Sequence, residues 1–265
     1  MERVSRIQMI DFHSHIMWGV DDGSKDIEMS GEMVKNSILQ EVAGICATPH
    51  FIIDEQEIDA DLYYSRLNKL KELYGRDINI LSGLEIYINP NIPKYYKEKK
   101  IWGLNNSRYV LIELPMRDYP VYTQDVFHEL LVLGAIPVIA HPERNFKIQK
   151  DIKLLEEILE QGALAQLNAG SICGMFGEAV KNMAEVLVKR NMIHIIGSDG
   201  HNNHRRRTDV ISAFQKVKNI NPELYRWMDE NNYNIINDLK VEVPEIQREA
   251  EKKNSFLNLF LRKKK

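Results

Sequence analysis

The sequence predicts an α/β fold, a distorted (β/α)7 TIM-like barrel with its active site at the C-terminal ends of the strands. Apolar segments typical of buried strands alternate with amphipathic helical segments along the 265 residues. Consecutive strands lie about 27 to 37 residues apart, roughly the length that a strand, a helix and two short loops require. Each strand ends in a metal-binding or amide side chain. Because the chain supplies seven such units and not eight, we expect an incomplete or distorted barrel.

The expected strands are short apolar runs, as parallel strands covered on both faces should be. They occupy residues 7–13, 42–48, 78–86, 109–114, 135–140, 163–168 and 192–198. Helical patterns fill the gaps at residues 27–40, 61–74, 124–133, 152–161, 177–190 and 209–218. The polar strand-to-helix loops should meet at one rim, where the active sites of barrels lie.

The composition is that of a single globular unit with a basic tail. With 44% hydrophobic residues and a net charge of −3, residues 1–244 can form one catalytic barrel with its C-terminal helices, and nothing favours nucleic-acid binding. Two cysteines are too few for a disulfide scaffold, and no segment has the about 18 apolar residues of a spanning helix. The first eight residues contain no apolar signal-peptide core. We therefore expect a cytoplasmic protein.

The strongest local signal is the pair His13 and His15 within the sequence Asp-Phe-His-Ser-His. Residues at positions i and i+2 of a strand point to the same face, so both imidazoles can reach one metal ion from the mouth of a barrel. A lone pair of this kind is only moderately specific. The other strand ends strengthen the interpretation, because charged side chains after apolar runs are costly unless they are paired or bound to a metal.

Together the strand ends offer nine oxygen and nitrogen ligands and no thiolate: His13, His15, Asp22, His50, Glu85, Glu113, His141, Asp199 and His201. One ion cannot use so many donors, so we predict a site of two or three ions. The all-N/O set suits Mn²⁺, Fe or Zn²⁺. Glu85 is the candidate for a bridging carboxylate. Asp21 is an alternative to Asp22.

Other polar residues are left outside the predicted ligand set. Asn168 ends a strand before Ala-Gly, where an amide is more often a loop cap. His128 lies inside an amphipathic helix, His194 opens a strand, and His204 sits among basic loop residues.

The order of motifs resembles the PHP superfamily of metal-dependent phosphoesterases and, within it, the bacterial protein-tyrosine phosphatases of the CpsB/CapC/YwqE type. The matching segments are the HxH pair, VDDG (20–23), ATPH (47–50), GLEIY (83–87), LIELP (111–115), AHPER (140–144) and SDGHN (198–202). The resemblance runs from about residue 9 to about residue 239. The extra residues before Met9, a run of three arginines after SDGHNNH, and the basic tail depart from the pattern.

This resemblance implies a trinuclear, usually manganese-dependent site in a (β/α)7 barrel. It also implies that the substrate is phosphotyrosine on the C-terminal tail of a membrane-associated capsule or exopolysaccharide tyrosine kinase. The residues support a phosphatase independently of the resemblance. A thiolate mechanism is excluded, because Ile52 and Ala179 stand six residues after Cys46 and Cys173, where a phosphate loop needs an arginine. A metal cluster instead lowers the pKa of bound water and supplies hydroxide.

Two arginines follow ligand motifs without being plausible ligands. Arg144 and Arg206 can each hold two phosphoryl oxygens through a planar guanidinium, and both match arginines of the family motifs. Asp199 or a metal-site histidine such as His201 can serve as general acid for the tyrosine leaving group, and the sequence does not choose between them. The side chains of Tyr87, Tyr119 and Tyr122 are weak candidates to flank the phenyl ring.

Two other functions stay open from sequence: a PHP-type phosphatase of a small phosphomonoester such as histidinol phosphate, and a non-catalytic regulator that binds the phosphorylated tail. The full ligand set argues against the second. Residues 245–265 form a basic amphipathic tail that can rest on an anionic membrane surface. The alternative, which we favour, is that this tail packs on its own barrel or on a neighbour.

Overall fold

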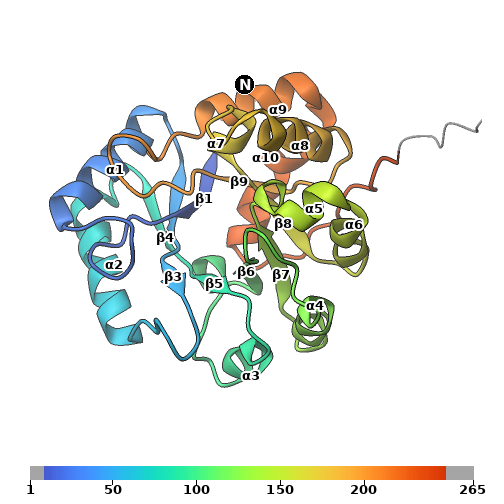
Figure 1. Ribbon diagram of the computed structural model, residues 1–265. Helices are drawn as coiled ribbons and strands as arrows, with labels where there is room; N and C mark the ends of the chain where they lie inside the picture. The colour runs from blue at the N-terminus through green and yellow to red at the C-terminus, as the bar shows by residue number, and fades with distance from the viewer. Residues whose placement is uncertain (1–8, 249–265) are drawn as a thin grey trace, which may run out of the picture.

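Parallel strands form the centre of the molecule, and helices surround them (Figure 1). The computed structural model describes residues 9–248. One sheet has the order β1 (Ile10–Ser14), β2 (Gly44–Ala47), β4 (Asn79–Ser82). The second has the order β3 (His50–Phe51), β5 (Glu85–Tyr87), β6 (Tyr109–Glu113), β7 (Ile136–Ala140), β8 (Leu164–Asn168), β9 (Ile195–Gly197). Every pairing between these strands is parallel, which confirms the predicted α/β class.

The two sheets join at both of their ends. Between β1 and the segment after β9, the Asp199 N–H donates to the His13 carbonyl (2.8 Å) and the His15 N–H donates to the Gly200 carbonyl (2.8 Å). On the other side, β2 continues into β3 and β4 continues into β5. If β2 with β3 and β4 with β5 are each counted as one strand, seven strands curl around one centre, as the sequence predicts.

Two predicted strands, residues 42–48 and 78–86, are each broken in two, which corrects their expected continuity. Thr48 and Pro49 separate β2 from β3, and proline has no N–H to donate to a ladder. Gly83 and Leu84 separate β4 from β5, and the Gly83 N–H donates to the hydroxyl of Tyr63 (2.9 Å) instead of to a strand. A Cβ at position 83 would lie 2.7 Å from a Thr48 methyl carbon, so only glycine fits this bend.

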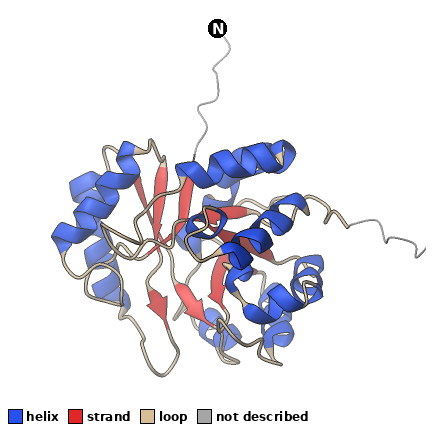
Figure 2. Ribbon diagram, turned by 45° about the horizontal axis from the view of Figure 1, so that its top comes forward, coloured by secondary structure: helices blue, strands red, loops and turns tan. Residues whose placement is uncertain are grey.

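The six predicted helices are present with small shifts: α1 (Ile27–Leu39), α2 (Ala60–Tyr74), α4 (Thr123–Val132), α6 (Lys153–Glu160), α8 (Glu178–Lys189) and α9 (Ile211–Ile220). Four helices had no individual prediction: α3 (Ile92–Lys97), α5 (Phe146–Lys150), α7 (Ala169–Ile172) and α10 (Pro222–Ile236). The 3-10 turns are η1 (Leu104–Asn106) and η2 (Pro142–Arg144). Figure 2 shows the helices packed around the strands. Within residues 9–248, no helix combines the length and apolar character needed to cross a membrane.

The C-terminal part of the described chain runs along α8 and the residues that follow it. The Gln247 N–H donates to the Arg190 carbonyl (2.9 Å), and the Asn191 amide donates to the Glu245 carbonyl (3.0 Å). Residues 249–265, which carry most of the predicted basic tail, lie outside the described residues. Both interpretations of the tail, packing on the barrel or a neighbour and contact with a membrane, therefore stay predictions.

Candidate metal centre

All nine predicted ligands meet at one place: His50 and Glu85 are the first residues of the short strands β3 and β5, and the others lie near or beyond the C-terminal ends of strands. They form four overlapping groups in which the donor atoms lie within 4.8 Å of one another. The groups are His15–Asp22–His50–His201, His13–His15–Asp199, His13–Glu85–His141 and His50–Glu85–Glu113. Because several residues belong to two groups, the cluster is suited to more than one ion.

The HxH pair behaves as the pleat of a strand predicts. His13 is the fourth residue of β1 and His15 follows the strand, and both side chains are fully buried. Their Nε2 atoms lie 3.2 Å apart, so the two imidazoles converge on a common point. The Glu85 Oε2 atom lies 3.2 Å from the first of these nitrogens and 3.3 Å from the second. This arrangement brings three potential ligand atoms from β1 and β5 to one place.

The surroundings of Glu85 fit a bound cation. Its Oε2 atom is buried and makes no aligned hydrogen bond, although ring nitrogens of His13, His15 and His50 lie within 3.3 Å. Burial, together with the negative charge of Glu85, raises the pKa of Glu113 to about 8. Two buried carboxylates and converging imidazoles call for positive charge between them. The residues present therefore fit the predicted metal centre, and their N/O donors suit Mn²⁺, Fe or Zn²⁺.

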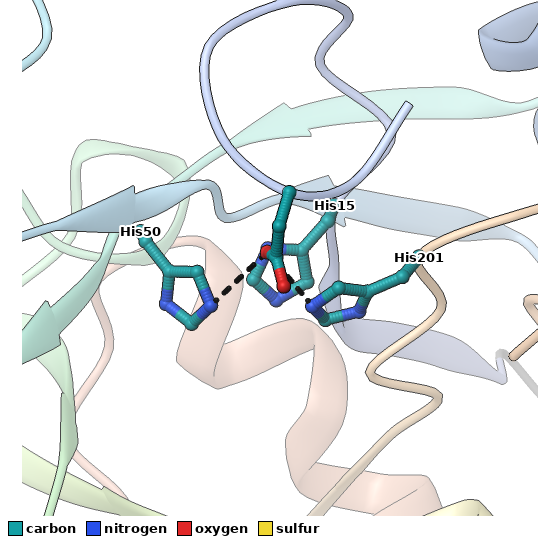
Figure 3. Close-up of side chains that lie close together, drawn as sticks. His15, His50 and His201 are labelled. Carbon is teal, nitrogen blue, oxygen red and sulfur yellow. Dashed lines mark ion pairs between the residues drawn. The ribbon is translucent and has the colours of Figure 1, made fainter. Parts of the chain in front are cut away.

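The outer part of the cluster is built around Asp22, on the loop after β1. One of its carboxylate oxygens lies 3.5 Å from His50 Nε2 and 3.3 Å from His201 Nε2. Figure 3 shows His15, His50 and His201 grouped around this carboxylate, whose contacts are the dashed lines. Hydrogen bonding to His201 lowers the pKa of Asp22 below its ordinary value. With its side chain 66% exposed, Asp22 lies at the solvent edge of the centre.

Asp21 and Asp22, which the sequence left as alternatives, have different positions. The Asp21 Oδ2 atom accepts a hydrogen bond from His15 Nδ1 (2.7 Å) and one from the backbone N–H of His50 (3.1 Å). A carboxylate on one ring nitrogen fixes the tautomer that leaves the other nitrogen free for a metal. Asp21 therefore orients His15, whereas Asp22 lies among the candidate ligands.

Gln166 on β8 supports the inner ligands, and the sequence analysis missed it. Its Oε1 atom lies 3.1 Å from His13 Nδ1 and accepts the backbone N–H of His141 at 3.2 Å. The Gln166 Nε2 atom donates to the Leu167 carbonyl at 2.7 Å, so Oε1 is the atom that accepts hydrogen bonds. The signal available in the sequence was a polar residue inside the apolar run 163–168. Gln166 thus holds the His13 ring with Nε2 toward the centre.

We predict that Gln166→Met weakens metal binding by about 10- to 100-fold, the usual cost of losing an outer-shell partner of a metal-bound histidine. Methionine keeps most of the volume and removes the hydrogen-bond acceptor. Gln166→Glu, which restores an acceptor oxygen, should retain affinity. Metal titrations of the refolded or chelator-treated proteins measure both values, and equal affinities in Gln166→Met and the parent protein would show that this contact is not needed.

Asp199 connects the cluster to the two predicted arginines. Its Oδ1 atom lies 3.8 Å from His13, 3.4 Å from His15 and 3.4 Å from His201 Nδ1. Its Oδ2 atom accepts hydrogen bonds from Arg144 Nη1 (2.7 Å) and Asn168 Nδ2 (2.8 Å) and forms an ion pair with Arg206 Nη2 (2.7 Å). Burial by itself would raise the pKa of Asp199, but the hydrogen bond with His15 and the nearby positive charges hold it well below its ordinary range.

Asn168 has two roles, one of which is the predicted cap. Its Oδ1 atom accepts the Gly170 N–H (2.8 Å) at the start of α7, and its side-chain amide donates to Asp199. Glu143, in the segment AHPER, was not singled out from the sequence. Its buried carboxylate accepts the Asn168 N–H (3.1 Å), and burial raises its pKa to about 7. Asn168 therefore supports Asp199 directly, and Glu143 supports Asn168.

The histidines left outside the ligand set lie away from the four groups. His194 is buried at the start of β9, where its Nδ1 atom accepts the Ala165 N–H (3.0 Å). His128 and His204 are exposed. Among the tyrosines, Tyr87 pairs in register with Glu113, whereas the Tyr119 hydroxyl lies 3.5 Å from the Leu154 carbonyl.

Comparison with known proteins shows which proteins this chain is similar to. The model of the family "Capsular polysaccharide synthesis, CpsB/CapC" matches residues 9–237. A CapC protein of Staphylococcus aureus is 36% identical over 235 residues, covering 87% of this chain and 92% of that protein. The tyrosine-protein phosphatase YwqE of Bacillus subtilis is 35% identical over 227 residues, covering 84% and 89%.

A solved structure gives the same relationship. It comes from work on YwqE from Bacillus subtilis and CpsB from Streptococcus pneumoniae, described as unique metal-dependent tyrosine phosphatases. The two folds superpose with a TM-score of 0.85 at 31% identity, covering 91% of this chain and all of that one. The chain therefore belongs to the CpsB/CapC family.

Proposed function

We propose that this protein is a metal-dependent protein-tyrosine phosphatase, a phosphoric monoester hydrolase. The observation that carries the proposal is the cluster of nine N/O donors with Arg144 and Arg206 on the outer oxygen of Asp199. YwqE is named a tyrosine-protein phosphatase, and the solved structure is described as that of metal-dependent tyrosine phosphatases. When bound, metal ions in such a cluster supply an activated water and neutralise phosphoryl charge.

The protein's own residues have separate tasks in this proposal. The nine ligands hold the ions, while Asp21 and Gln166 fix the rings of His15 and His13. Arg144 and Arg206 bind the non-bridging phosphoryl oxygens, because their guanidinium groups already meet at one point. Asp199 Oδ2 accepts hydrogen bonds from Arg144 and Asn168 and pairs with Arg206, which suits a carboxylate that stays ionised.

The finer parts of the proposal concern the metal, the partner and the cellular place. We infer that the site holds three Mn²⁺ ions, with Fe and Zn²⁺ as alternatives, and the overlap of the ligand groups supports more than one ion. The family description places its members in capsular polysaccharide synthesis. We infer that the substrate is the phosphorylated tail of a membrane-associated bacterial tyrosine kinase, and that the enzyme acts in the cytoplasm at the inner face of the membrane.

A substrate panel tests the proposed activity. The metal-loaded protein should hydrolyse phosphotyrosine peptides with a kcat/KM at least about 10²-fold above that for phosphoserine peptides or histidinol phosphate, since discrimination of that size is common in sites shaped for one group. Preference for histidinol phosphate would replace the proposal by a small-molecule phosphatase. Tight binding of phosphotyrosine peptides without release of phosphate would identify a non-catalytic regulator.

A further inference from the structure

Beside the metal centre lies a cavity of about 160 Å³ between α7, the loop before α8, and the start of α9. Asp199 and Arg206 line one part of it, and Met175 and Phe176 line another. A cavity of about 150 Å³ with apolar walls is large enough to hold benzene. We propose that this cavity binds the aryl group of the substrate, with Phe176 and Met175 as its apolar wall. The proposal rests on the proposed phosphatase function and concerns its selectivity.

Phe176 links the cavity to the phosphate-binding arginines. The Arg144 guanidinium carbon lies 4.3 Å from the centre of the Phe176 ring, within the range of a cation–π contact. Arg144 in turn donates to Asp199. The Phe176 ring therefore contacts Arg144, which is predicted to bind phosphate, and also forms a wall of the cavity. If Arg144 binds the phosphoryl group of an aryl phosphate, the aryl group would lie close to Phe176.

The loop that carries the two apolar side chains packs directly on α7. A Cβ at Gly170 would lie 3.0 Å from the Met175 sulfur and 3.2 Å from a Phe176 ring carbon, so any larger residue at position 170 would push the loop away. Met175 is nevertheless 54% exposed, although large apolar side chains are usually buried. Its exposure beside charged groups suits a side chain that is covered when substrate binds.

The polar side of the cavity fits the phosphate end of an aryl phosphate. Arg206 binds Asp199 through Nη2, and its Nε atom is buried without a hydrogen-bond partner. Arg207 and Asp209, which also line the cavity, pair with each other at 2.9 Å and so cancel in charge. An anionic head next to Arg206 and an apolar ring against Phe176 describe an aryl phosphate better than an aliphatic one.

Glycines on both sides of the apolar pair set the path of the loop. Gly174 and Gly177 have φ values of +88° and +92°, which other residues rarely adopt. A Cβ at Gly177 would meet no atom within 4 Å, so space is not what requires glycine there. The backbone conformation requires it, and the loop can present Met175 and Phe176 toward the cavity.

The first test compares an aryl phosphate with inorganic phosphate in Phe176→Ala. We expect the KM for phenyl phosphate to rise by about 10-fold or more, the scale of losing apolar contact with one ring, while the inhibition constant of inorganic phosphate stays within about twofold. Phe176→Tyr, which keeps the ring, should restore the KM. Phe146→Ala is the matched control, because Phe146 is 47% exposed on α5 with the Lys150 ammonium 4.2 Å from its ring centre, yet it does not line the cavity.

Each outcome decides the proposal. An unchanged KM in Phe176→Ala overturns the aryl site, and an equal weakening for phenyl phosphate and inorganic phosphate shows that the ring only positions Arg144. Failure of the parent protein to hydrolyse any phosphotyrosine peptide or phenyl phosphate rejects the proposed function instead.

A second measurement reads binding without catalysis. Cys173 lines the cavity and is exposed, whereas Cys46, the other cysteine, is buried. In the metal-loaded protein, phenylphosphonate should slow alkylation of Cys173 by at least about threefold at saturation, and inorganic phosphate should not. Equal protection by both anions, or protection by neither, would contradict binding of a ring in this cavity. Because no hydrolysis is required, this result does not depend on the proposed activity.

Discussion

Glu85→Ala is expected to lower kcat for an aryl phosphate by at least about 10²-fold and to reduce the bound metal. Glu85 belongs to two of the four ligand groups, and its Oε2 atom lies within 3.3 Å of three histidine nitrogens. Removing it leaves converging imidazoles without their shared carboxylate. The expected loss matches that of one strong electrostatic contribution in an active site, about 2.7 kcal/mol. Steady-state kinetics and metal analysis of the purified variant measure both effects.

Two comparisons make this result specific. His13→Ala and Asp199→Ala should cause losses of similar size, since each residue is a member of the same cluster. Glu98→Ala is the control, because the Glu98 side chain pairs with Lys100 at the surface and takes no part in the ligand groups. Turnover close to that of the parent protein in metal-replete Glu85→Ala would contradict its place in the centre.

Arg144→Ala and Arg206→Ala are expected to keep the full metal content and to lose kcat/KM for phosphotyrosine peptides by about 10²-fold or more. Neither arginine is a ligand, but both form an ion pair with Asp199 Oδ2 at 2.7 Å, so their guanidinium groups meet beside the cluster. A clamp that strengthens as charge moves onto the phosphoryl oxygens should lower mainly kcat, whereas uniform binding would change KM alone.

Lysine variants and metal analysis complete this prediction. Arg144→Lys and Arg206→Lys should recover only part of the activity, because an ammonium keeps the charge but not the two-pronged geometry. Kinetics like those of the parent protein in both alanine variants would remove the arginines from the site. Loss of metal from the alanine variants would instead indicate that the two arginines serve to hold Asp199 in place.

The sequence could predict that the candidate ligands lie close together, because the rules that place strand ends are local. Alternation in β1 brings His13 and His15 to one face, and parallel strands bring Glu85, Glu113 and His141 to the same rim. The class of fold followed from the same alternation of strands and helices. These features depend on the order of residues and not on details of packing.

The features that the sequence missed depend on contacts between distant segments. In the sequence, Gln166 is an ordinary polar residue within an apolar run. Its role follows from the fold, because β1 and β7 place His13 and His141 beside it. The choice between Asp21 and Asp22 is decided by the path of the loop over His15. The break between β4 and β5 involves the hydroxyl of Tyr63 from α2, 20 residues before Gly83.

The most direct test of the account is hydrolysis of a phosphotyrosine peptide by the purified protein before and after removal of metal. We expect that chelation abolishes activity, that Mn²⁺ restores it, and that metal analysis of the active protein finds two or three ions per chain, held by N/O donors. Cys46→Ser should stay active, and Cys173→Ser should keep its kcat with any change confined to KM, because neither thiol belongs to the cluster and Cys173 only lines the neighbouring cavity. Full activity in metal-free protein, or loss of activity in a folded serine variant, would contradict the metal-dependent mechanism.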